Sequence, residues 1–406
     1  MSQVQEEGCQ QHPLEGVRQL IDGLDQQIIK LLHQRMKLVG EVASIKEERG
    51  IPVCDLEREA QILERYEKEF RDSSWAAELR YMMKQIIAGS RAYQSRILGQ
   101  KREEGWKWQR SSDSFDAQAF QKRQFAYQGV QGSFGYQALQ RFLQARVIPY
   151  EPTKLQSYPT FADLAAAIVQ GEVDYGMLPV ENSYAGTVQE VYELLAQPSL
   201  HIIEEWILPI SHHLLVNPGG ELAAIEAVIS HPQALQQCDH FLQEHPHWNR
   251  LTSSNTAASA RKVAVMGDLH VAAIASEEAA SIYGLEILIP HIESNVGNRT
   301  RFVLIGREPS WHAEANKLSL CFTLPDRTGA LVEVLSAFLV HQINMVHIHS
   351  QPAKTTPWHY QFFVDIEGNL QQSNVLAALE LVESMTHTLK LIGNYPAGEE
   401  PSSRRR

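Results

Sequence analysis

Residues 298–302, with the sequence NRTRF, place a threonine hydroxyl beside an arginine just before a short apolar run at 303–306 that predicts a strand. At the mouth of a strand, such a pair can bind a small anion and give it a proton. For an isolated pair, the simpler interpretation is that Thr300 and Arg301 begin an ordinary strand, one facing in and one facing out. The functional interpretation depends on whether other polar loops reach the same kind of position.

Further polar turns follow predicted strands throughout residues 123–306, where short apolar runs alternate with helical patterns. They lie at 129–134, 179–183, 230–235 and 253–257. In open α/β sheets, ligands bind at the carboxyl ends of strands, where helix N-termini favour anions. Two lobes with a cleft between them are therefore predicted. The turn Gly129-x-x-Gly132 matches neither a Walker motif nor a dinucleotide fingerprint, so it predicts no nucleotide site.

Residues 14–98 carry apolar residues at helical spacing, with breaks at 50–52 and 72–74, which predicts three helices. Arg35 and Lys46 are eleven residues apart, within about 20° of the same helix face. Arg18 lies about 100° round the helix from Arg35, so it serves another surface or another subunit. A first helix of about 30 residues is about 45 Å long, too long for two more helices of one chain to cover. It predicts dimerisation.

The second and third helices carry polar residues that could face these cations. Asp55 is a good N-cap, and Arg58 and Glu59 follow it by three and four residues. Ser90 and Gln94 share one face of the third helix. Each of these residues alone is more typical of a solvated surface. Two cations that point toward polar residues on apolar-faced helices favour a binding site for an anion.

Composition restricts the class of protein. With 406 residues, two to four domains are expected, and 44% hydrophobic and 21% charged residues are typical of a soluble globular chain. A net charge of -12 argues against a nucleic-acid partner. No signal peptide, membrane span or paired cysteine spacing is visible, which predicts a cytoplasmic protein with reduced thiols at Cys9, Cys54, Cys238 and Cys321. The 17 histidines offer no zinc spacing, so neither metal nor cofactor is predicted.

The polar residues of the helical region fall at the spacing of the all-helical chorismate mutases, which form the amino end of bifunctional P-proteins. The positions that match are Arg18, Arg35, Lys46, Asp55, Arg58, Glu59, Ser90 and Gln94. The resemblance implies an intertwined dimer in which Arg18 reaches the partner's site. It also implies that Arg18 and Arg35 bind the carboxylates of chorismate, that Lys46 and Gln94 donate to the ether oxygen, and that Glu59 accepts from the ring hydroxyl. It assigns supporting roles in the same site to Asp55, Arg58 and Ser90.

The loop motifs at 129–134, 179–183, 230–233 and 298–302, taken in this order, resemble prephenate dehydratase. The resemblance implies a two-lobed fold like that of periplasmic binding proteins, with Thr300 contacting the ring hydroxyl that leaves. The cleft would be lined by Glu181, Asn182, Ser183, Ser230, Gln233 and Asn255. Arg301 or His212 would bind the substrate's carboxylates, or else pack the strand. Gly135 departs from the family, which usually has a hydroxyl residue there.

Residues 316–396 predict the order βαββαβ, which is ferredoxin-like. The segment 325–331, PDRTGAL, resembles the first turn of an ACT domain, so Gly329, Ala330 and Leu331 are expected to bind an effector, L-phenylalanine. The second sensor motif is usually Glu-Ser-Arg-Pro, whereas this chain has His349-Ser350-Gln351-Pro352. Because two charges are lost, we expect weak feedback.

These observations predict a multidomain chain with an all-α mutase domain at 1–100, a linker at 101–122, an α/β dehydratase at 123–310, an α+β ACT domain at 316–396 and a disordered tail at 397–406. The expected activity converts chorismate to prephenate and then to phenylpyruvate in a homodimer or higher homo-oligomer. A prephenate decarboxylase and a non-catalytic amino-acid sensor are the alternatives. The intact Thr300-Arg301-Phe302 motif argues against the first, and the eight matching mutase positions argue against the second.

Overall fold

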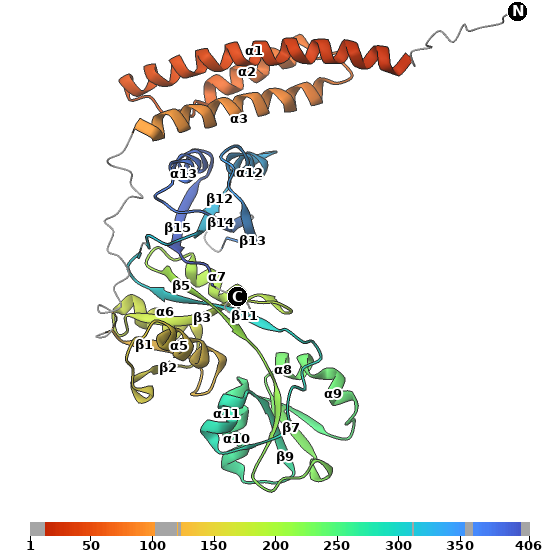
Figure 1. Cartoon of the computed structure of the whole chain (residues 1–406), viewed down its shortest axis with the longest axis vertical. Coiled ribbons are helices and arrows are strands. Elements are labelled where there is room, and N and C mark those ends of the chain that lie inside the picture. The colour runs from red at the N-terminus through yellow and green to blue at the C-terminus, as the bar shows by residue number, and fades with distance from the viewer. Residues whose placement is uncertain (1–12, 102–119, 121–122, 311, 354–359, 399–406) are drawn as a thin grey trace, which may run out of the picture. The chain divides into compact units, whose positions relative to one another are not determined.

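The computed structural model describes residues 13–101, 120, 123–310, 312–353 and 360–398. Cys9, residues 399–406 and nearly all of the predicted linker lie outside these ranges. The described chain forms two compact units, which contain the elements labelled in Figure 1. Within the described ranges, no helix has the length and apolar character needed to cross a bilayer.

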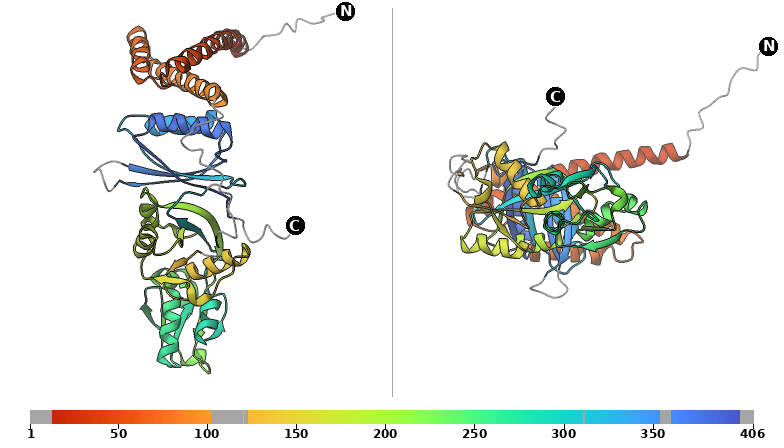
Figure 2. Two further views of the ribbon diagram at one scale, coloured as in Figure 1. Left: turned by 90° about the vertical axis from the view of Figure 1, so that its left-hand side faces the viewer. Right: turned by 90° about the horizontal axis from the view of Figure 1, so that it is seen from below.

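Unit 1 is helical. It contains α1 (Pro13–Arg49), α2 (Leu56–Glu69), α3 (Ala76–Lys101), α12 (Ala330–Val340) and α13 (Ser373–Met385). The first three are the helices predicted from periodicity. Asp55 caps α2 by accepting a hydrogen bond from the backbone N–H of Arg58 at 3.0 Å. With 37 residues, α1 is longer than predicted, about 56 Å, and Figure 2 shows it unbroken.

The amino-terminal half of α1 has no cover in the single chain. Val17, Ile21, Leu24, Ile28 and Leu31 recur every three or four residues and are 49–64% exposed. The carboxyl-terminal half is different, because a Cβ on Gly40 would contact the rings and methyls of α3, 3.6 Å from Tyr93. An uncovered apolar stripe of this length is typical of a surface that binds another protein.

The first sheet of unit 2 has the order β2-β1-β3-β11-β5, with β4 paired to β3. Its strands are β1 (Phe125–Gln128), β2 (Gln156–Tyr158), β3 (Tyr175–Asn182), β4 (Gly186–Thr187), β5 (His201–Pro209) and β11 (Arg299–Gly306). The helices α5 (Phe134–Ala145), α6 (Phe161–Gln170) and α7 (Gln189–Leu195) accompany it. β11 starts at Arg299, earlier than the apolar run predicted, so Thr300 and Arg301 lie inside the strand.

The second sheet has the order β10-β6-β9-β7-β8. It is built from β6 (His213–Val216), β7 (Ala227–Ser230), β8 (Asn249–Thr252), β9 (Val271–Ala275) and β10 (Glu286–Ile289), with helices α8 (Pro232–Gln237), α9 (Asp239–Gln243), α10 (Thr256–Met266) and α11 (Glu277–Tyr283). Short 3-10 turns lie at Pro152–Lys154 and Leu222–Ala224. The chain passes between the two sheets from β5 to β6 and back from β10 to β11, which confirms the two-lobed prediction (Figure 1).

The third sheet is antiparallel, in the order β13-β14-β12-β15. Its strands are β12 (Lys317–Thr323), β13 (Met345–Pro352), β14 (Tyr360–Glu367) and β15 (Thr388–Tyr395). With α12 and α13 in their places along the chain, the order βαββαβ is the ferredoxin-like one that was predicted. Cys321, Phe363, Ile392 and Tyr395 share one apolar core with β3 and β11 of the first sheet.

The predicted tail at 397–406 begins too early. The backbone N–H of Ala397 donates to Asn316 Oδ1 at 2.7 Å, and that of Gly398 donates to Glu205 Oε1 at 2.9 Å. Ala397 and Gly398 are therefore held against the fold, because both N–H groups find acceptors in residues that are far away in the sequence.

Gly393 of β15 approaches β5 so closely that a Cβ would collide with the carbonyl oxygen of Ile202 and lie 3.0 Å from its Cβ. We expect Gly393→Ala to destabilise the fold by about 1–3 kcal/mol, since the backbones must separate. Gly89→Ala is the control, because nothing lies within 4 Å of its added Cβ. Calorimetry should show a lower unfolding midpoint for Gly393→Ala alone, and equal midpoints would contradict this packing.

Candidate functional site

The pairing of β3 with β11 places Asn182 directly opposite Thr300. The Asn182 side-chain N–H groups donate to Thr300 Oγ1 at 2.9 Å and to Asn298 Oδ1 at 2.8 Å. Its oxygen accepts from the backbone N–H groups of Tyr184 at 3.1 Å and Ala185 at 2.9 Å, which fixes the orientation of the amide. Because the Thr300 oxygen already accepts a hydrogen bond, its own hydrogen remains available for a ligand.

Ser183 joins the same network. Its hydroxyl accepts from the backbone N–H of Arg299 at 3.0 Å and lies 3.4 Å from Asn298 Oδ1. Asn182, Asn298 and Thr300 are all buried. The structure therefore brings together the predicted residues Asn182, Ser183 and Thr300. It adds Asn298, for which the only sequence signal was its place at the start of the NRTRF segment.

Arg301 and Glu181 belong to the opposite face of the same strand pair, since neighbouring residues in a strand point to opposite sides. The Arg301 side chain is 12% exposed, and its guanidinium lies 2.6 Å from Asp365 Oδ2 and 3.1 Å from Glu205 Oε2. Its Nε lies 3.3 Å from Glu181 Oε2. Burial opposes the charge, yet Asp365 and Glu205 hold the pKa of Arg301 well above its usual value. Of the two predicted roles for Arg301, this placement favours packing of the strand.

Asn255 and Gln233, two further predicted site residues, belong to the second lobe. Asn255 caps α10, accepting from the backbone N–H of Ala258 at 2.7 Å. Its side-chain nitrogen lies 3.4 Å from where a Cβ on Gly129 would stand, and Gly129 has φ +99, a conformation that favours glycine. Gln233 lies in the first turn of α8, beside His231. Ser230 is fully buried, and its hydroxyl donates to the carbonyl of Ile274 at 2.7 Å, a bond within the lobe.

His212 lies in the crossing from β5 to β6. Its Nε2 is 2.8 Å from Gln237 Oε1, its backbone N–H donates to Glu293 Oε2, and its ring packs edge-on against Phe134. Burial lowers the pKa of His212. A neutral imidazole cannot attract a carboxylate as a cation does, so this placement favours packing for His212 as well.

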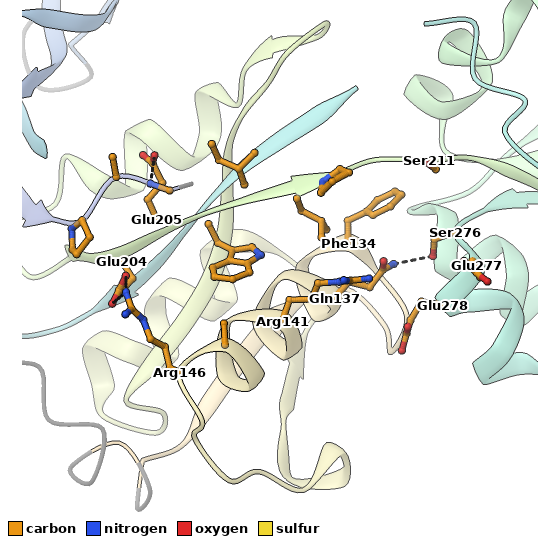
Figure 3. Close-up of a pocket in the computed structure, with 18 of the residues that line it drawn as sticks. Phe134, Gln137, Arg141, Arg146, Glu204, Glu205, Ser211, Ser276, Glu277 and Glu278 are labelled. Atoms are coloured by element: carbon orange, nitrogen blue, oxygen red, sulfur yellow. Dashed lines mark hydrogen bonds and ion pairs between the residues drawn. The ribbon is translucent and has the colours of Figure 1, made fainter. Parts of the chain in front are cut away.

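A cavity of about 870 Å³ lies beside α5, and residues of β5 and of the second lobe also line it (Figure 3). Figure 3 shows Gln137 and Arg141 of α5, and Arg146 just after it, in the cavity wall. Gln137 Nε2 donates to Ser276 Oγ at 2.8 Å. This bond joins the two lobes. Neither Asn182 nor Thr300 is among the described residues that line the cavity.

In unit 1, Arg35 of α1 donates to the hydroxyl of Ser90 on α3. The Gln94 side chain donates to the Ser90 carbonyl at 3.4 Å, and its own oxygen is buried with no hydrogen-bond partner. Lys46 Nζ donates to the carbonyl of Val53 at 2.7 Å. The structure therefore brings Arg35, Ser90 and Gln94 together across two helices, with polar groups still available to a ligand.

Glu59 of α2 is half-buried, and burial raises its pKa although Arg91 acts in the opposite direction from 3.5 Å. The charges of Lys46 and Asp55 also influence the pKa of Glu59, so these three predicted residues lie in one region. Arg91 was not predicted. It is buried on α3, and the only sequence signal was its position beside Ser90.

Arg18 and Arg58 lie apart from these contacts. Arg18 is 63% exposed, with Glu15 at 3.9 Å, and it lies about 25 Å along α1 from Arg35. Arg58 is exposed on α2, where its backbone N–H is capped by Asp55. No group of three or more side chains suited to a metal ion occurs among the described residues.

Three family models match the chain in order, namely Chorismate mutase type II at residues 17–95, Prephenate dehydratase at 125–310 and ACT domain at 319–381. Two solved structures are similar, each with 30% identity and a TM-score of 0.60. The prephenate dehydratase of Arthrobacter aurescens in complex with L-Phe covers 67% of this chain and 90% of its own. GqqA, described as a quorum quenching acylase, covers 70% of this chain and 100% of its own.

Curated relatives extend the similarity to almost the whole chain. The bifunctional chorismate mutase/prephenate dehydratase of Enterobacter agglomerans is 31% identical over 95% of this chain and 96% of that protein. Its namesake from Escherichia coli K12 is 32% identical over 95% of this chain and 97% of that protein. With all three domains matched in order and at this coverage, the chain belongs to the family of bifunctional chorismate mutase/prephenate dehydratases.

Proposed function

We propose that this chain converts chorismate to prephenate on its helical unit and prephenate to phenylpyruvate, carbon dioxide and water on its two-lobed unit. The observation that carries the dehydratase is the hydrogen bond from Asn182 to Thr300, which leaves the threonine hydroxyl as a donor. The similarity to bifunctional relatives over 95% of the chain supports both activities together.

The dehydratase step breaks two bonds. The ring carboxylate leaves as carbon dioxide, and the electron pair of that C–C bond moves into the ring as the C–O bond to the ring hydroxyl breaks. The hydroxyl departs as water once it has gained a proton, and the ring becomes aromatic. Thr300 donates to the departing oxygen, where negative charge develops. Asn182 holds Thr300 in that orientation.

The substrate contacts of the dehydratase come from both lobes. We assign Asn182, Ser183 and Thr300 from the first lobe, and Gln233 and Asn255 from the second. We assign supporting roles to Ser230, His212, Glu181 and Arg301, because each of these side chains is hydrogen-bonded or ion-paired to another residue of the protein. Asn255 faces the Gly129 turn, so closure of the two lobes around prephenate would bring the contacts together.

The mutase step is a concerted rearrangement that needs neither acid, base nor nucleophile. The enzyme has to hold a compact conformer and stabilise charge on the ether oxygen. Arg35 binds a carboxylate, Lys46 and Gln94 donate to the ether oxygen, and Glu59 accepts from the ring hydroxyl. Asp55, Arg58 and Ser90 support these groups. Arg91 holds the Glu59 carboxylate from 3.5 Å.

The mutase site is completed by a second chain. Within one chain, Arg18 lies about 25 Å along α1 from Arg35, so it cannot serve the same site. The apolar stripe on α1 that includes Ile21 and Ile28 is exposed, and burying it against a partner would place the partner's Arg18 near Arg35. We therefore propose a homodimer, at least, in the cytoplasm. Cys54, Cys238 and Cys321 are free thiols, as that compartment favours.

We propose that L-phenylalanine binds the ACT domain. Gly329 has φ +86 at the start of α12, so the backbone there turns as only glycine does easily. Gly329, Ala330 and Leu331 would offer backbone N–H groups to the effector. In β13, His349 Nε2 and Gln351 Oε1 are buried with no hydrogen-bond partner, and neither brings the fixed charge of the usual motif. We therefore expect weak feedback.

The alternatives differ in their products. A prephenate decarboxylase releases carbon dioxide without aromatising the ring, so it has no need of a donor to the ring hydroxyl. Thr300 and Asn182 supply that donor, which favours dehydration. An amino-acid sensor would turn over neither substrate. Feeding chorismate to the purified protein and identifying phenylpyruvate separates all three functions.

Lys46→Ala should lower the mutase rate by about 100-fold or more, because a donor to the transition-state oxygen is lost. The dehydratase rate should stay near that of the parent. The control is Lys37→Ala, since Lys37 is exposed on the same helix. Each activity is measured separately, with chorismate or with prephenate as substrate. Equal loss of both activities in a folded Lys46→Ala protein would refute separate sites.

Thr300→Val should lower the dehydratase kcat by about 100-fold or more while prephenate still binds, because valine keeps the shape and loses only the donor. Thr252→Val, an exposed position in β8, is the matched control. Turnover assays measure kcat, and an equilibrium titration measures the binding of prephenate. Turnover at the parent rate would mean that Thr300 is structural.

Arg18→Ala and Lys46→Ala should each lower the mutase rate by about 100-fold or more. Co-expression of the two variants should nevertheless recover about a quarter of the parent activity. In a mixed dimer with shared sites, one site carries both defects and the other carries none. The variants purified alone are the controls, and sedimentation verifies the dimer. No recovery from a verified mixed dimer would show that Arg18 serves its own subunit.

A further inference from the structure

Arg301, the neighbour of Thr300, forms a polar contact between strand β11 and the third sheet. Its guanidinium lies 2.6 Å from Asp365 Oδ2 on β14 and 3.1 Å from Glu205 Oε2 on β5. Thr300 faces one side of β11 and Arg301 the other. The strand that carries the proposed proton donor is therefore tied, one residue away, to a sheet that has no part in the chemistry.

The two acids are themselves held by the third sheet and the end of the chain. Lys317 Nζ lies 2.8 Å from Glu205 Oε2, and the backbone N–H of Gly398 donates to Glu205 Oε1. Ser319 Oγ donates to Asp365 Oδ1 at 2.5 Å. The Asp365 side chain is 5% exposed and that of Glu205 2%, so removing one partner weakens the compensation of a buried charge.

The charges of Arg301 and Asp365 persist at neutral pH. Burial alone would raise the pKa of Asp365, but Arg301 and Lys317 outweigh it and hold that pKa below its usual value. Burial opposes the charge of Arg301 as well, but Asp365 and Glu205 hold the pKa of Arg301 well above its usual value. The contacts are therefore ion pairs with defined geometry, which can hold a backbone more strictly than apolar packing does.

Tyr192 of α7 links the same guanidinium to β13. Arg301 Nη2 donates to the hydroxyl of Tyr192 at 2.8 Å, and that hydroxyl lies 3.2 Å from His347 Nε2. The rings of Tyr192 and His349 are 5.5 Å apart. β13 carries the second sensor motif, so the strand proposed to sense the effector and the strand with Thr300 meet at Arg301 through one tyrosine.

We propose that Arg301 is a positioning residue for the dehydratase. Its ion pair with Asp365 makes the placement of Thr300 depend on the third sheet, and through this pair the effector signal reaches the active site. Positioning matters at this scale because a displacement of about 1 Å of a catalytic group can cost about 100-fold in rate. The inference rests on the proposed function, since it needs prephenate turnover to be observed.

The central variant is Asp365→Asn, which keeps the shape and removes the charge. It should lower the dehydratase kcat by about 5- to 100-fold, the range typical of coupling between sites, with little change in KM and none in the mutase rate. The matched control is Arg146→Gln, which breaks the 2.7 Å ion pair of the neighbouring buried acid, Glu204, without touching Arg301. Its kcat should stay near that of the parent.

A double-mutant cycle with Arg301→Gln isolates the pair. If the ion pair is the route, the double variant should be no worse than the poorer single variant, and Arg301→Lys should rescue part of the loss. Tyr192→Phe keeps the ring and removes only the hydroxyl, which contacts both Arg301 and His347, so it tests the link to β13 with little risk to folding. Tyr192→Phe and Asp365→Asn should both blunt the effect of added L-phenylalanine on kcat.

Three outcomes would overturn the proposal. If folded Asp365→Asn has the kcat of the parent protein and the same response to L-phenylalanine, the ion pair affects neither catalysis nor regulation. An equal loss in Arg146→Gln would indicate general weakening of unit 2. A rise in KM in Arg301→Gln alone would show that Arg301 binds the substrate directly. A parent protein that fails to release phenylpyruvate would instead refute the proposed function, so the two failures are distinguishable.

Discussion

The antiparallel pairing of β3 with β11 is the constraint on which the dehydratase site depends. Its register sets Asn182 against Thr300 on one face and Glu181 against Arg301 on the other. The first pair forms a polar network that orients a hydroxyl donor, and the second forms a buried ion cluster. A slip of one residue would exchange the two faces, because side chains alternate along a strand.

The same pairing explains why chemistry and regulation can share a short stretch of chain. Thr300 faces the side of α5, where Phe302 and Leu304 pack, whereas Arg301 faces the core that the first and third sheets have in common. Two adjacent side chains thus belong to two different environments. In the proposed coupling, a shift of Arg301 reaches Thr300 through the backbone of β11.

The helical unit depends on a different constraint, the length of α1. Its carboxyl-terminal half packs on α3 and collects Arg35, Ser90 and Gln94, while the stripe from Val17 to Leu31 has no cover in one chain. Arg18 lies next to Val17 of that stripe, far along the helix from Arg35 and Lys46. Because α1 is too long for the other helices of one chain to cover, its length explains both the proposed dimer and the proposed sharing of sites between subunits.

The sequence alone determined the helices, the two lobes and the ferredoxin-like order, because periodicity and turn residues act locally. It also indicated Thr300, Lys46 and Glu59, whose motifs are contiguous or on one helix. Only the tertiary structure decided that Arg301 turns away from Thr300 toward Asp365, that Asn298 joins the network and that Arg91 meets Glu59. Those contacts depend on strand register and on which helices meet, and both are set by burial of distant parts of the chain, which no local pattern records.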